Sequence, residues 1–409
     1  MGLDQALSFD LNTIDQSFIE NPYPTLQNLR QFDPVHVNPD GSLFLTRYED
    51  VRAVYRDKTM VSEKTEAFKE KFGPGPLYDH HTTSLVFNDP PYHTTVRKLL
   101  ANAFTTQKLS KMEPLIETVV DELLNELEGS GDVDFVSQFA MRLPTEVISF
   151  MLGVPSEYRY KLRGFSMAIL GALDPRITQD QLDVGNEAVR EFSSILNDLI
   201  NHRRRHPEGA GQGEVLEALI FGEFEGRKLT QEELIQNCIF LLNAGHETTT
   251  SLMANGMHML MLSPDQYALL VEQPEYIDLA VEEILRYESP LQIGNRMTTE
   301  ARTIGGRLVP AGTFIHTSIA AANRDASVFQ HPDKIDLCRQ PNRHLSFITG
   351  IHVCLGATLA RYEGRIAFRR LTAKFPSIQP AGEPKRLPMA RFRGFKRLPV
   401  RMEPPGTDV

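Results

Sequence analysis

The sequence contains little cysteine, with three thiols, Cys238, Cys338 and Cys354, in 409 residues. So few cysteines, in an odd number, do not make a disulfide framework and are typical of a cytosolic protein that keeps its thiols reduced. No two of them have Cys-x-x-Cys spacing, which excludes a zinc ribbon and a thioredoxin-type redox site. The sequence Cys-x-x-Cys-His is also absent, which excludes covalent attachment of a c-type haem.

Long apolar runs and an excess of basic charge are missing as well. The N-terminal segment has recurring acidic residues and no apolar run of signal-peptide length. The longest apolar-rich stretch, residues 234–262, contains His246, Glu247 and several other polar residues, so it cannot cross a membrane. The formal net charge of −10 argues against a nucleic-acid binder, which would usually be basic. We therefore expect a soluble, cytoplasmic protein whose partners include neither a membrane nor a nucleic acid.

Helical patterns dominate, and strand-like patterns are short and gather mainly in two places. The first is Val35–Thr46, which ends in the alternating residues LFLT. The second is Arg302–Ser318, where Gly305-Gly306 and Pro310-Ala311-Gly312 separate apolar runs as hairpin turns do. The sequence therefore predicts a mainly α fold with small β sheets.

Neither repeats nor low-complexity segments divide the chain. The stretch from Pro376 onward is rich in proline and arginine and suggests a further short strand region. Residues 206–213 (HPEGAGQG) resemble a linker, but we interpret them as a loop between helices. We expect a single domain over residues 1–409.

One helix is predicted to be buried along its length. Thr230 and Glu233 form a capping-box sequence, and the helical pattern then runs to Leu262, just before Ser263-Pro264. The segment is apolar on nearly all faces, which is typical of a central helix. A polar cluster at its middle, residues 244–248 (AGHET), therefore needs a reason, because buried polar groups without partners are costly.

The sharpest motif surrounds the third cysteine. Its fixed positions are Phe347, Gly350, His352, Cys354 and Gly356, and a long helical pattern follows. A helix N-terminus stabilises a thiolate through its unpaired amides and its dipole, and the thiolate is the form that binds metals. The two glycines allow a flat group to approach the backbone closely. A lone cysteine is more often a structural core residue, which remains our interpretation of the other two, but five fixed positions favour a ligand.

This segment resembles the haem-binding loop of the cytochrome P-450 family. The family usually has glycine directly after the phenylalanine, whereas this chain has Ile348, a departure that alters the loop but leaves the ligand in place. The resemblance implies the family's fold, with haem b (iron protoporphyrin IX) between the long central helix and the helix after the cysteine. It also implies that Cys354 binds the iron and that the following residues contact the cofactor: His93, Arg97, Ala244, Gly245, Arg296, Phe347, His352 and Gly356.

Three further segments match the family in the same order, so the resemblance covers essentially the whole chain. Glu247 and Thr248 correspond to an acid–alcohol pair that delivers protons, and Thr248 can bond back to the carbonyl of Ala244. Glu283 and Arg286 correspond to a structural pair that extends to a later arginine, for which Arg339 and Arg343 are both candidates. The sequence Asp89-Pro-Pro opens the helix of His93 and Arg97, with Asp89 as its expected cap.

The resemblance implies an oxidoreductase, a monooxygenase that inserts one atom of O2 into an organic substrate while the other leaves as water. The chain has no flavin or iron–sulfur motif, so a separate ferredoxin-type donor with its reductase would supply electrons. An acidic ferredoxin would dock on a locally basic face, for which the candidates are Lys98, Lys108, Lys111, Arg361, Arg365 and Arg369.

The substrate is less readable than the reaction. The segments that line the pocket in the family are here mostly apolar with two amides, which suggests a small or medium hydrophobic molecule with one polar group. The expected substrate contacts are Leu85, Val86, Phe240, Asn243, Leu291, Gln292 and Ile293.

Three alternatives remain open. A peroxygenase would use hydrogen peroxide in place of O2 and ferredoxin, but such proteins often have arginine where this chain has Glu247. A non-enzymatic haem sensor would need the haem site and no proton relay. A protein without haem, in which Cys354 is structural, would be colourless after haem-replete expression.

Overall fold

The computed structural model describes residues 2–102, 104–175, 177–207 and 213–403, and its secondary structure is mainly helical with four small sheets in that part of the chain, as the sequence predicts. The described residues form two compact units. The first unit comprises described residues within 2–61, 116–142 and 248–403, and the second comprises those within 62–115 and 143–247.

A five-stranded sheet is the main β element of the first unit. Its strands, in sheet order, are β1 (Val35–Val37), β2 (Leu43–Leu45), β8 (Phe314–Ser318), β5 (Ile293–Thr298) and β3 (Met60–Val61). All neighbouring pairs are antiparallel except β2 and β8, which are parallel. Leu43, Leu45 and Ile315 are buried in one core cluster with Val51 of α4 (Tyr48–Arg56). This cluster forms the floor on which the cysteine loop packs.

The two predicted turns between Arg302 and Ser318 have different outcomes. Gly305 and Gly306 have φ angles of 55° and 85° and join β6 (Arg302–Ile304) to β7 (Arg307–Val309) in a hairpin. The hairpin predicted at residues 310–312 is wrong, because β7 and β8 belong to different sheets. The chain instead crosses to β5, where Gly312 donates its backbone N–H to the carbonyl of Thr298 at 2.7 Å.

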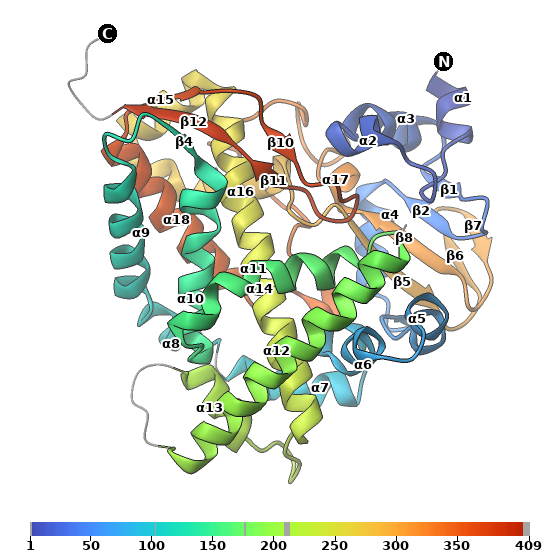
Figure 1. Ribbon diagram of the computed structural model, residues 1–409. Helices are drawn as coiled ribbons and strands as arrows, with labels where there is room; N and C mark the ends of the chain where they lie inside the picture. The colour runs from blue at the N-terminus through green and yellow to red at the C-terminus, as the bar shows by residue number, and fades with distance from the viewer. Residues whose placement is uncertain (1, 103, 176, 208–212, 404–409) are drawn as a thin grey trace. The chain divides into compact units, whose positions relative to one another are not determined.

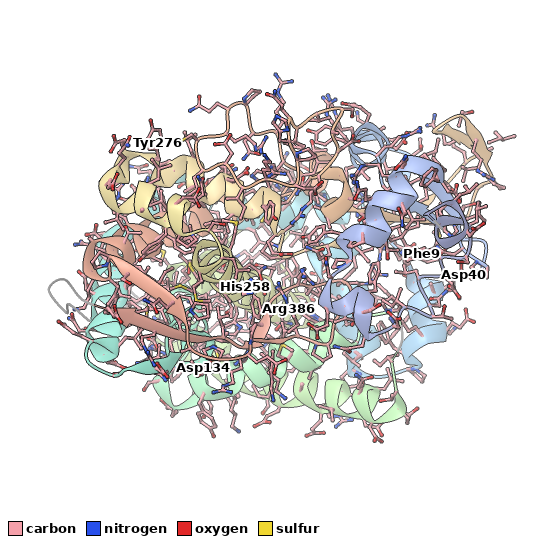
Figure 2. The ribbon with its side chains drawn as sticks, turned by 90° about the horizontal axis from the view of Figure 1, so that it is seen from above. Phe9, Asp40, Asp134, His258, Tyr276 and Arg386 are labelled. Atoms are coloured by element: carbon pink, nitrogen blue, oxygen red, sulfur yellow. The ribbon has the colours of Figure 1, made fainter. Side chains whose placement is uncertain are left out.

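The C-terminal region forms strands, as predicted, and they anchor the later part of the central helix. The strands are β9 (Ser377–Pro380), β10 (Lys385–Arg386), β11 (Phe395–Arg397) and β12 (Pro399–Glu403), and β12 pairs with both β9 and β4 (Asp132–Asp134) (Figure 1). The Phe395 ring lies 4.7 Å from the His258 ring and 3.9 Å from the Arg386 guanidinium (His258 and Arg386 are labelled in Figure 2). Burial, together with the nearby charge of Arg386, lowers the pKa of His258 to about 4.

Helices make up the rest of the first unit. They are α1 (Gly2–Leu7), α2 (Gln16–Glu20), α3 (Tyr23–Phe32), α4, α15 (Pro264–Glu272), α16 (Ile277–Tyr287), α17 (Ile319–Ala322) and α18 (Ala357–Lys374), with the short helices η2 (Val136–Ala140), η3 (Pro274–Tyr276) and η4 (Gly350–His352). A Cβ atom on Gly256 would lie 2.4 Å from the Phe368 ring of α18. Glycine at this position therefore lets the central helix approach α18 closely.

The second unit is almost entirely helical. Its elements are α5 (Thr65–Phe72), α6 (Pro76–Thr83), η1 (Leu85–Phe87), α7 (Tyr92–Ala101), α8 (Thr106–Ser110), α11 (Ser156–Gly171), α12 (Gln179–Arg205) and α13 (Glu214–Phe221). The loop predicted at 206–213 falls between α12 and α13, and its residues 208–212 lie outside the described part of the chain. Helices α9 (Glu113–Leu127), α10 (Arg142–Leu152) and α14 (Gln231–Met261) have residues in both units.

Helix α14 is the predicted central helix, and its start is formed as the sequence predicts. Glu233 donates its backbone N–H to Thr230 Oγ1 at 3.2 Å, and Thr230 donates its own N–H to Glu233 Oε2 at 2.9 Å. The capping box is thus confirmed, and the helix ends at Met261, one residue before the predicted end. In the part of the chain that the structure describes, no helix combines the length and the apolar character that a membrane crossing requires.

Candidate functional site

Cys354 is exposed and lies between η4 and the first turn of α18, as the motif predicts. Its backbone N–H donates to the carbonyl of Phe347 at 3.0 Å, and Val353 donates to the carbonyl of Gly350 at 3.1 Å. These bonds close the loop on itself, so the position of the thiol is set by the backbone. None of the three cysteines forms a disulfide within the described residues.

Gly350 holds this loop against α4. Its φ angle is 78°, and a Cβ atom there would lie 2.0 Å from the carbonyl oxygen of Tyr55. Any other residue at this position would be strained by the left-handed backbone, and its Cβ atom would force the loop away from Tyr55. The motif glycine is therefore required by this chain's own packing.

Ile348 also has a left-handed backbone, with a φ angle of 49°. A β-branched residue in this conformation is an outlier that costs roughly 1–2 kcal/mol relative to a right-handed one. Its side chain packs against the core cluster of β1, β2, β8 and α4, and its N–H donates to the carbonyl of Leu345 at 2.7 Å. The departure from the usual glycine thus places a strained, partly buried isoleucine in the loop.

The charged groups beside the cysteine are paired. Arg361, one turn into α18, makes two hydrogen bonds to Glu282, at 2.6 and 2.9 Å, and its guanidinium lies 4.6 Å from the Phe347 ring. Its hydrogen bond to the Glu282 carboxylate raises the pKa of Arg361. Burial alone would raise the pKa of Glu282, but Arg361 and His344 outweigh it and lower the value to about 2. The positive charge of Arg361 is therefore balanced by the Glu282 carboxylate, which makes it less available to bind a partner protein.

Arg296 is positioned by a buried tyrosine of α4. Its guanidinium lies 4.9 Å from the Tyr55 ring, and the Tyr55 hydroxyl is 2.7 Å from Thr317 Oγ1. A Cβ atom on Gly294 would lie 1.9 Å from the Tyr55 hydroxyl, so β5 fits only with glycine there. Arg296 is 7% exposed and His352 is 8% exposed. The first unit thus holds two of the predicted cofactor contacts as buried, potentially cationic side chains.

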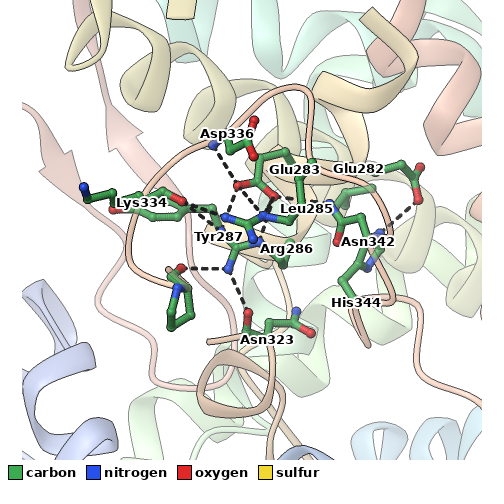
Figure 3. A network of polar contacts seen from close by, with 12 residues as sticks. Glu282, Glu283, Leu285, Arg286, Tyr287, Asn323, Lys334, Asp336, Asn342 and His344 are labelled. Carbon is green, nitrogen blue, oxygen red and sulfur yellow. Dashed lines mark hydrogen bonds and ion pairs between the residues drawn. The ribbon is translucent and has the colours of Figure 1, made fainter. Parts of the chain in front are cut away.

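Glu283 and Arg286 form the centre of a buried ion-pair network in the first unit (Figure 3). Arg286 donates to both carboxylate oxygens of Glu283, at 2.7 and 2.8 Å, and the two residues are 1% exposed or less. Arg339 donates from Nε to the same carboxylate at 3.0 Å, whereas Arg343 is exposed and only its carbonyl accepts a bond, from Tyr48. Of the two candidates that the sequence left open, Arg339 is the one that pairs.

The guanidinium groups of this network also hold the chain segment that precedes the cysteine loop. Arg286 Nη1 donates to the carbonyls of Asn323 and Pro332, at 2.9 and 2.8 Å, and Arg339 Nη1 donates to that of Gln330 at 2.7 Å. Buried carbonyls of an irregular segment need such donors, because no sheet or helix supplies them. The network therefore organises the segment that leads to residue 347.

In the second unit, α7 carries His93 and Arg97 four residues apart on one face. His93 is 3% exposed and Arg97 is half-buried. The prediction that Asp89 caps this helix is wrong, because Pro91 occupies the N-cap position. The Asp89 carboxylate instead accepts the backbone N–H groups of Ser62 and Glu63, both at 2.8 Å, since these amides have no helix or strand partner.

The polar cluster of α14 is deeply buried in its second-unit part. Glu247 is 1% exposed, and neither carboxylate oxygen has a hydrogen-bond partner among the described residues. The imidazole Nδ1 of His246 lies 3.7 Å from Glu247 Oε2. Thr248 follows in the first unit and is half-buried. A buried carboxyl group without hydrogen-bond partners destabilises the folded state unless a water or a ligand satisfies it. Such groups are typical of functional positions.

The predicted substrate residues of the second unit lie on η1 and α14. Leu85 is buried, and its N–H donates to Asn237 Oδ1 of α14 at 2.9 Å, so η1 is tied to the helix. Val86 and Phe240 are half-buried. Asn243 is 2% exposed and accepts a hydrogen bond from Ser166 of α11, which the sequence did not single out. The two residues are 77 positions apart, so no local pattern could have linked them.

The predicted substrate residues of the first unit are joined by a C-terminal segment that sequence reasoning missed. Leu291 pairs with Phe392 in an isolated bridge, and Gln292 donates its N–H to the carbonyl of Arg391 at 2.8 Å. Arg391 in turn donates from Nη1 to the carbonyl of Ile293 at 3.3 Å. Only the fold brings residues 391–392 to this segment.

The residues present fit a haem held by a single thiolate. In the described residues, no cluster of three or more histidine, cysteine, aspartate or glutamate side chains could hold a metal by itself. Cys354 offers instead one exposed sulfur at the head of α18, on a loop fixed by Gly350. Arg296 and His352 are buried in the same unit, and both side chains have ring or guanidinium N–H groups that can donate hydrogen bonds to a carboxylate.

Comparison with known proteins gives consistent matches over nearly the whole chain. The sequence profile of the family described as Cytochrome P450 matches residues 27–161 and 173–402. The vitamin D(3) 25-hydroxylase of Pseudonocardia autotrophica is 37% identical over 396 residues, which are 95% of each chain. The biotin biosynthesis cytochrome P450 of Bacillus subtilis (strain 168) is 34% identical and is covered to 99%, with 96% of this chain.

A solved structure gives the same picture of the fold. The crystal structure of P450BioI in complex with a hexadec-9Z-enoic acid ligated acyl carrier protein has a TM-score of 0.89 to this chain. The two chains are 34% identical, and the match covers 95% of this chain and all of the other. The predicted mainly α fold with small sheets is therefore that of a known family.

Proposed function

This chain belongs to the cytochrome P450 family, and on that premise we propose that it inserts one oxygen atom from O2 into a small or medium hydrophobic organic substrate. The observation that carries the proposal is Cys354, an exposed thiol fixed by the Phe347 carbonyl and Gly350 at the head of α18. The chain's family and the names of its relatives, which include hydroxylases and monooxygenases, support an oxidoreductase that incorporates oxygen.

The proposed cofactor is haem b, with Cys354 as the iron ligand. His93, Arg97, Arg296 and His352 would bind its carboxylates through charge-assisted hydrogen bonds, and Ala244, Gly245, Phe347 and Gly356 would contact its faces. When bound, the haem supplies oxygen activation, which the electron density of a thiolate ligand favours. The protein's own part is to hold the sulfur, orient the substrate and exclude water.

Glu247 and Thr248 are proposed to move protons. The Glu247 carboxyl has no hydrogen-bond partner among the described side chains, so it is able to accept and release a proton rather than being held in a fixed pair. Thr248, the following residue of α14, has a hydroxyl that can donate or accept a hydrogen bond. We propose that both groups take part in delivering protons to the reaction site.

Electrons are proposed to come from a ferredoxin-type protein with its reductase, because the chain has no flavin or iron–sulfur motif of its own. The basic surface expected to bind it is less positive than the sequence suggested. Arg361 is paired with Glu282, and Arg365 lies 4.0 Å from Asp278. In the second unit, Lys98 lies 4.3 Å from the Phe224 ring, which leaves its charge in place. Lys98 is therefore a stronger candidate contact than Arg361.

The proposed substrate class is broad. The first-unit and second-unit segments expected to contact it are mostly apolar, with Asn243 and Gln292 as the two amides. Two of the similar proteins are named for vitamin D(3) or are solved with hexadec-9Z-enoic acid on an acyl carrier protein, and both of these small molecules are largely apolar. We expect the substrate to be taken up from the cytoplasm, where ferredoxin and reductase are available.

A spectral experiment tests the proposal. The reduced, haem-loaded protein treated with carbon monoxide is expected to show the red-shifted absorption that a sulfur donor imposes. Cys354→Ala is expected to lose that band, whereas the matched control Cys338→Ala keeps it, because Cys338 lies in the segment before the cysteine loop and binds no iron. A band that survives in Cys354→Ala would mean that the ligand is wrong.

A second experiment separates the proposed reaction from the peroxide-driven one. With a supplied ferredoxin and reductase, substrate-dependent consumption of NADH is expected, and it would exclude a pure haem sensor. Turnover with hydrogen peroxide alone, and none with ferredoxin, would instead identify a peroxygenase.

A further inference from the structure

Asn243 presents a buried hydrogen-bond donor without an acceptor. The residue lies on α14 and is 2% exposed, and its side-chain nitrogen Nδ2 has no hydrogen-bond partner among the described residues. Its oxygen Oδ1 accepts a hydrogen bond from the hydroxyl of Ser166 at 2.8 Å. Ser166 lies on α11 and is 1% exposed. The amide is thus held at one end and unsatisfied at the other.

This arrangement is costly without a ligand. An amide N–H that loses its water on burial and gains no acceptor destabilises the folded protein. If the amide turned over, Nδ2 could donate to the Ser166 hydroxyl, but Oδ1 would then be the buried atom without a partner, so one end of the amide stays unsatisfied in either orientation. We therefore expect the unsatisfied amide group to form a hydrogen bond with a group from outside the chain.

The position of Asn243 relates it to the proposed proton route. It lies one helical turn before Glu247, on the same face of α14, at a rise of about 6 Å along the axis. A substrate oxygen bound to Nδ2 would therefore be held about one helical turn from Glu247. An uncharged amide donor suits a neutral acceptor, such as a carbonyl oxygen of the ligand.

We propose that the Asn243 amide nitrogen donates a hydrogen bond to a carbonyl oxygen of the substrate, and that Ser166 orients the amide for this purpose. The proposal rests on the monooxygenase function proposed above and narrows its substrate to an apolar molecule that carries a ketone or ester carbonyl. Asn243 is then a specificity-determining residue and Ser166 a positioning residue.

The test is a binding titration of the haem-loaded protein, followed by the change in haem absorption when a ligand displaces water. The probes are cyclododecanone and cyclododecane, which share a ring and differ in one carbonyl, with cyclooctanone and cyclooctane as a smaller pair. The wild-type protein is expected to bind the ketone about tenfold more tightly than the hydrocarbon, which corresponds to one hydrogen bond.

Four variants locate the effect. Asn243→Leu and Asn243→Asp are expected to lose the preference for the ketone, because leucine has no donor and a carboxylate only accepts. Ser166→Ala is expected to reduce the preference about threefold, because the amide can then rotate. The matched control Ser149→Ala removes another fully buried hydroxyl of the second unit that has no partner in the described chain, and it should leave the preference unchanged.

The outcomes separate this inference from the proposed function. If the carbon monoxide spectrum shows thiolate ligation but no ketone binds more tightly than its hydrocarbon, the inference is wrong and the function stands. A ketone preference that survives in both Asn243 variants would mean that a group other than Asn243 binds the carbonyl, and it would also overturn the inference. Thermal unfolding of each variant guards against misfolding, and Ser166→Ala keeps the test open if both Asn243 variants fail to fold.

Discussion

The loop around Cys354 and the polar centre of α14 differ in how completely their groups are satisfied. The loop is closed by its own backbone bonds, pressed against Tyr55 at Gly350, and preceded by a segment that Arg286 and Arg339 hold through its carbonyls. In α14, by contrast, Asn243 and Glu247 are buried with polar atoms that have no partner among the described residues. The loop, whose polar groups satisfy one another, is suited to hold a permanently bound group in one position. The centre of α14, whose polar atoms lack partners, is suited to bind groups that are exchanged during a reaction, such as substrate and protons.

The largest loss of stability is expected when the buried ion-pair network that holds the segment before the cysteine loop is broken. Glu283→Ala leaves the guanidinium groups of Arg286 and Arg339 buried without their carboxylate, which costs about 3–5 kcal/mol. We expect poor haem incorporation and a strongly lowered midpoint of chemical unfolding. Asp132→Asn serves as the control, because it breaks only an exposed pair with Arg401 and should leave the midpoint nearly unchanged.

A smaller effect is expected from a substitution in the proposed proton route. It should change the yield of product and leave the stability of the fold unchanged. Thr248→Ala removes the hydroxyl of the proposed proton route, so we expect product formed per NADH consumed to fall at least about tenfold while peroxide accumulates. Haem content and the unfolding midpoint should stay near the wild-type values. The control is Thr249→Ala, the neighbouring buried hydroxyl. Full coupling in the Thr248 variant would argue against the route.

Sequence patterns predicted local features better than the partners of individual side chains. The capping box of Thr230 and Glu233 was predictable because both residues lie within one turn. The choice of Arg339 over Arg343 was not, because it depends on where the carbonyls of an irregular segment point. Ser166 was missed because its partner Asn243 is 77 residues away. Asp89 was misjudged because a carboxylate before a helix can also bind the amides of a neighbouring segment.

The helix that follows the cysteine offers a test by pH. Glu363 of α18 is 2% exposed, its Oε2 has no partner in the described part of the chain, and burial raises its pKa to about 8. The folded state therefore holds a proton that the unfolded chain releases near its ordinary pKa. The stability that this proton linkage contributes is full below the ordinary value and is lost as the pH rises towards about 8.

Glu363→Gln should remove this loss because a neutral amide does not titrate. We expect the melting temperature of the variant, relative to wild type, to rise by about 2 °C or more between pH 5 and pH 9. Glu272→Gln, at an exposed end of α15, should show the same difference at both pH values. A pH-independent difference for Glu363→Gln would mean that the buried carboxyl is not protonated in the folded protein.

The smallest effect concerns the strain within the rigid loop. At most positions alanine is more stabilising than glycine, but at the φ angle of 49° of Ile348 the order should reverse. Both Ile348→Ala and Ile348→Gly lose the packing against the β1–β2–β8 core, so the difference between them isolates the backbone. We expect Ile348→Gly to be more stable than Ile348→Ala by about 1 kcal/mol in chemical unfolding. At Ala360, inside α18, the wild-type alanine should be more stable than Ala360→Gly, which is the ordinary order. If alanine were the more stable residue at both positions, the loop would not be strained at residue 348, and its rigidity would rest on its contacts alone.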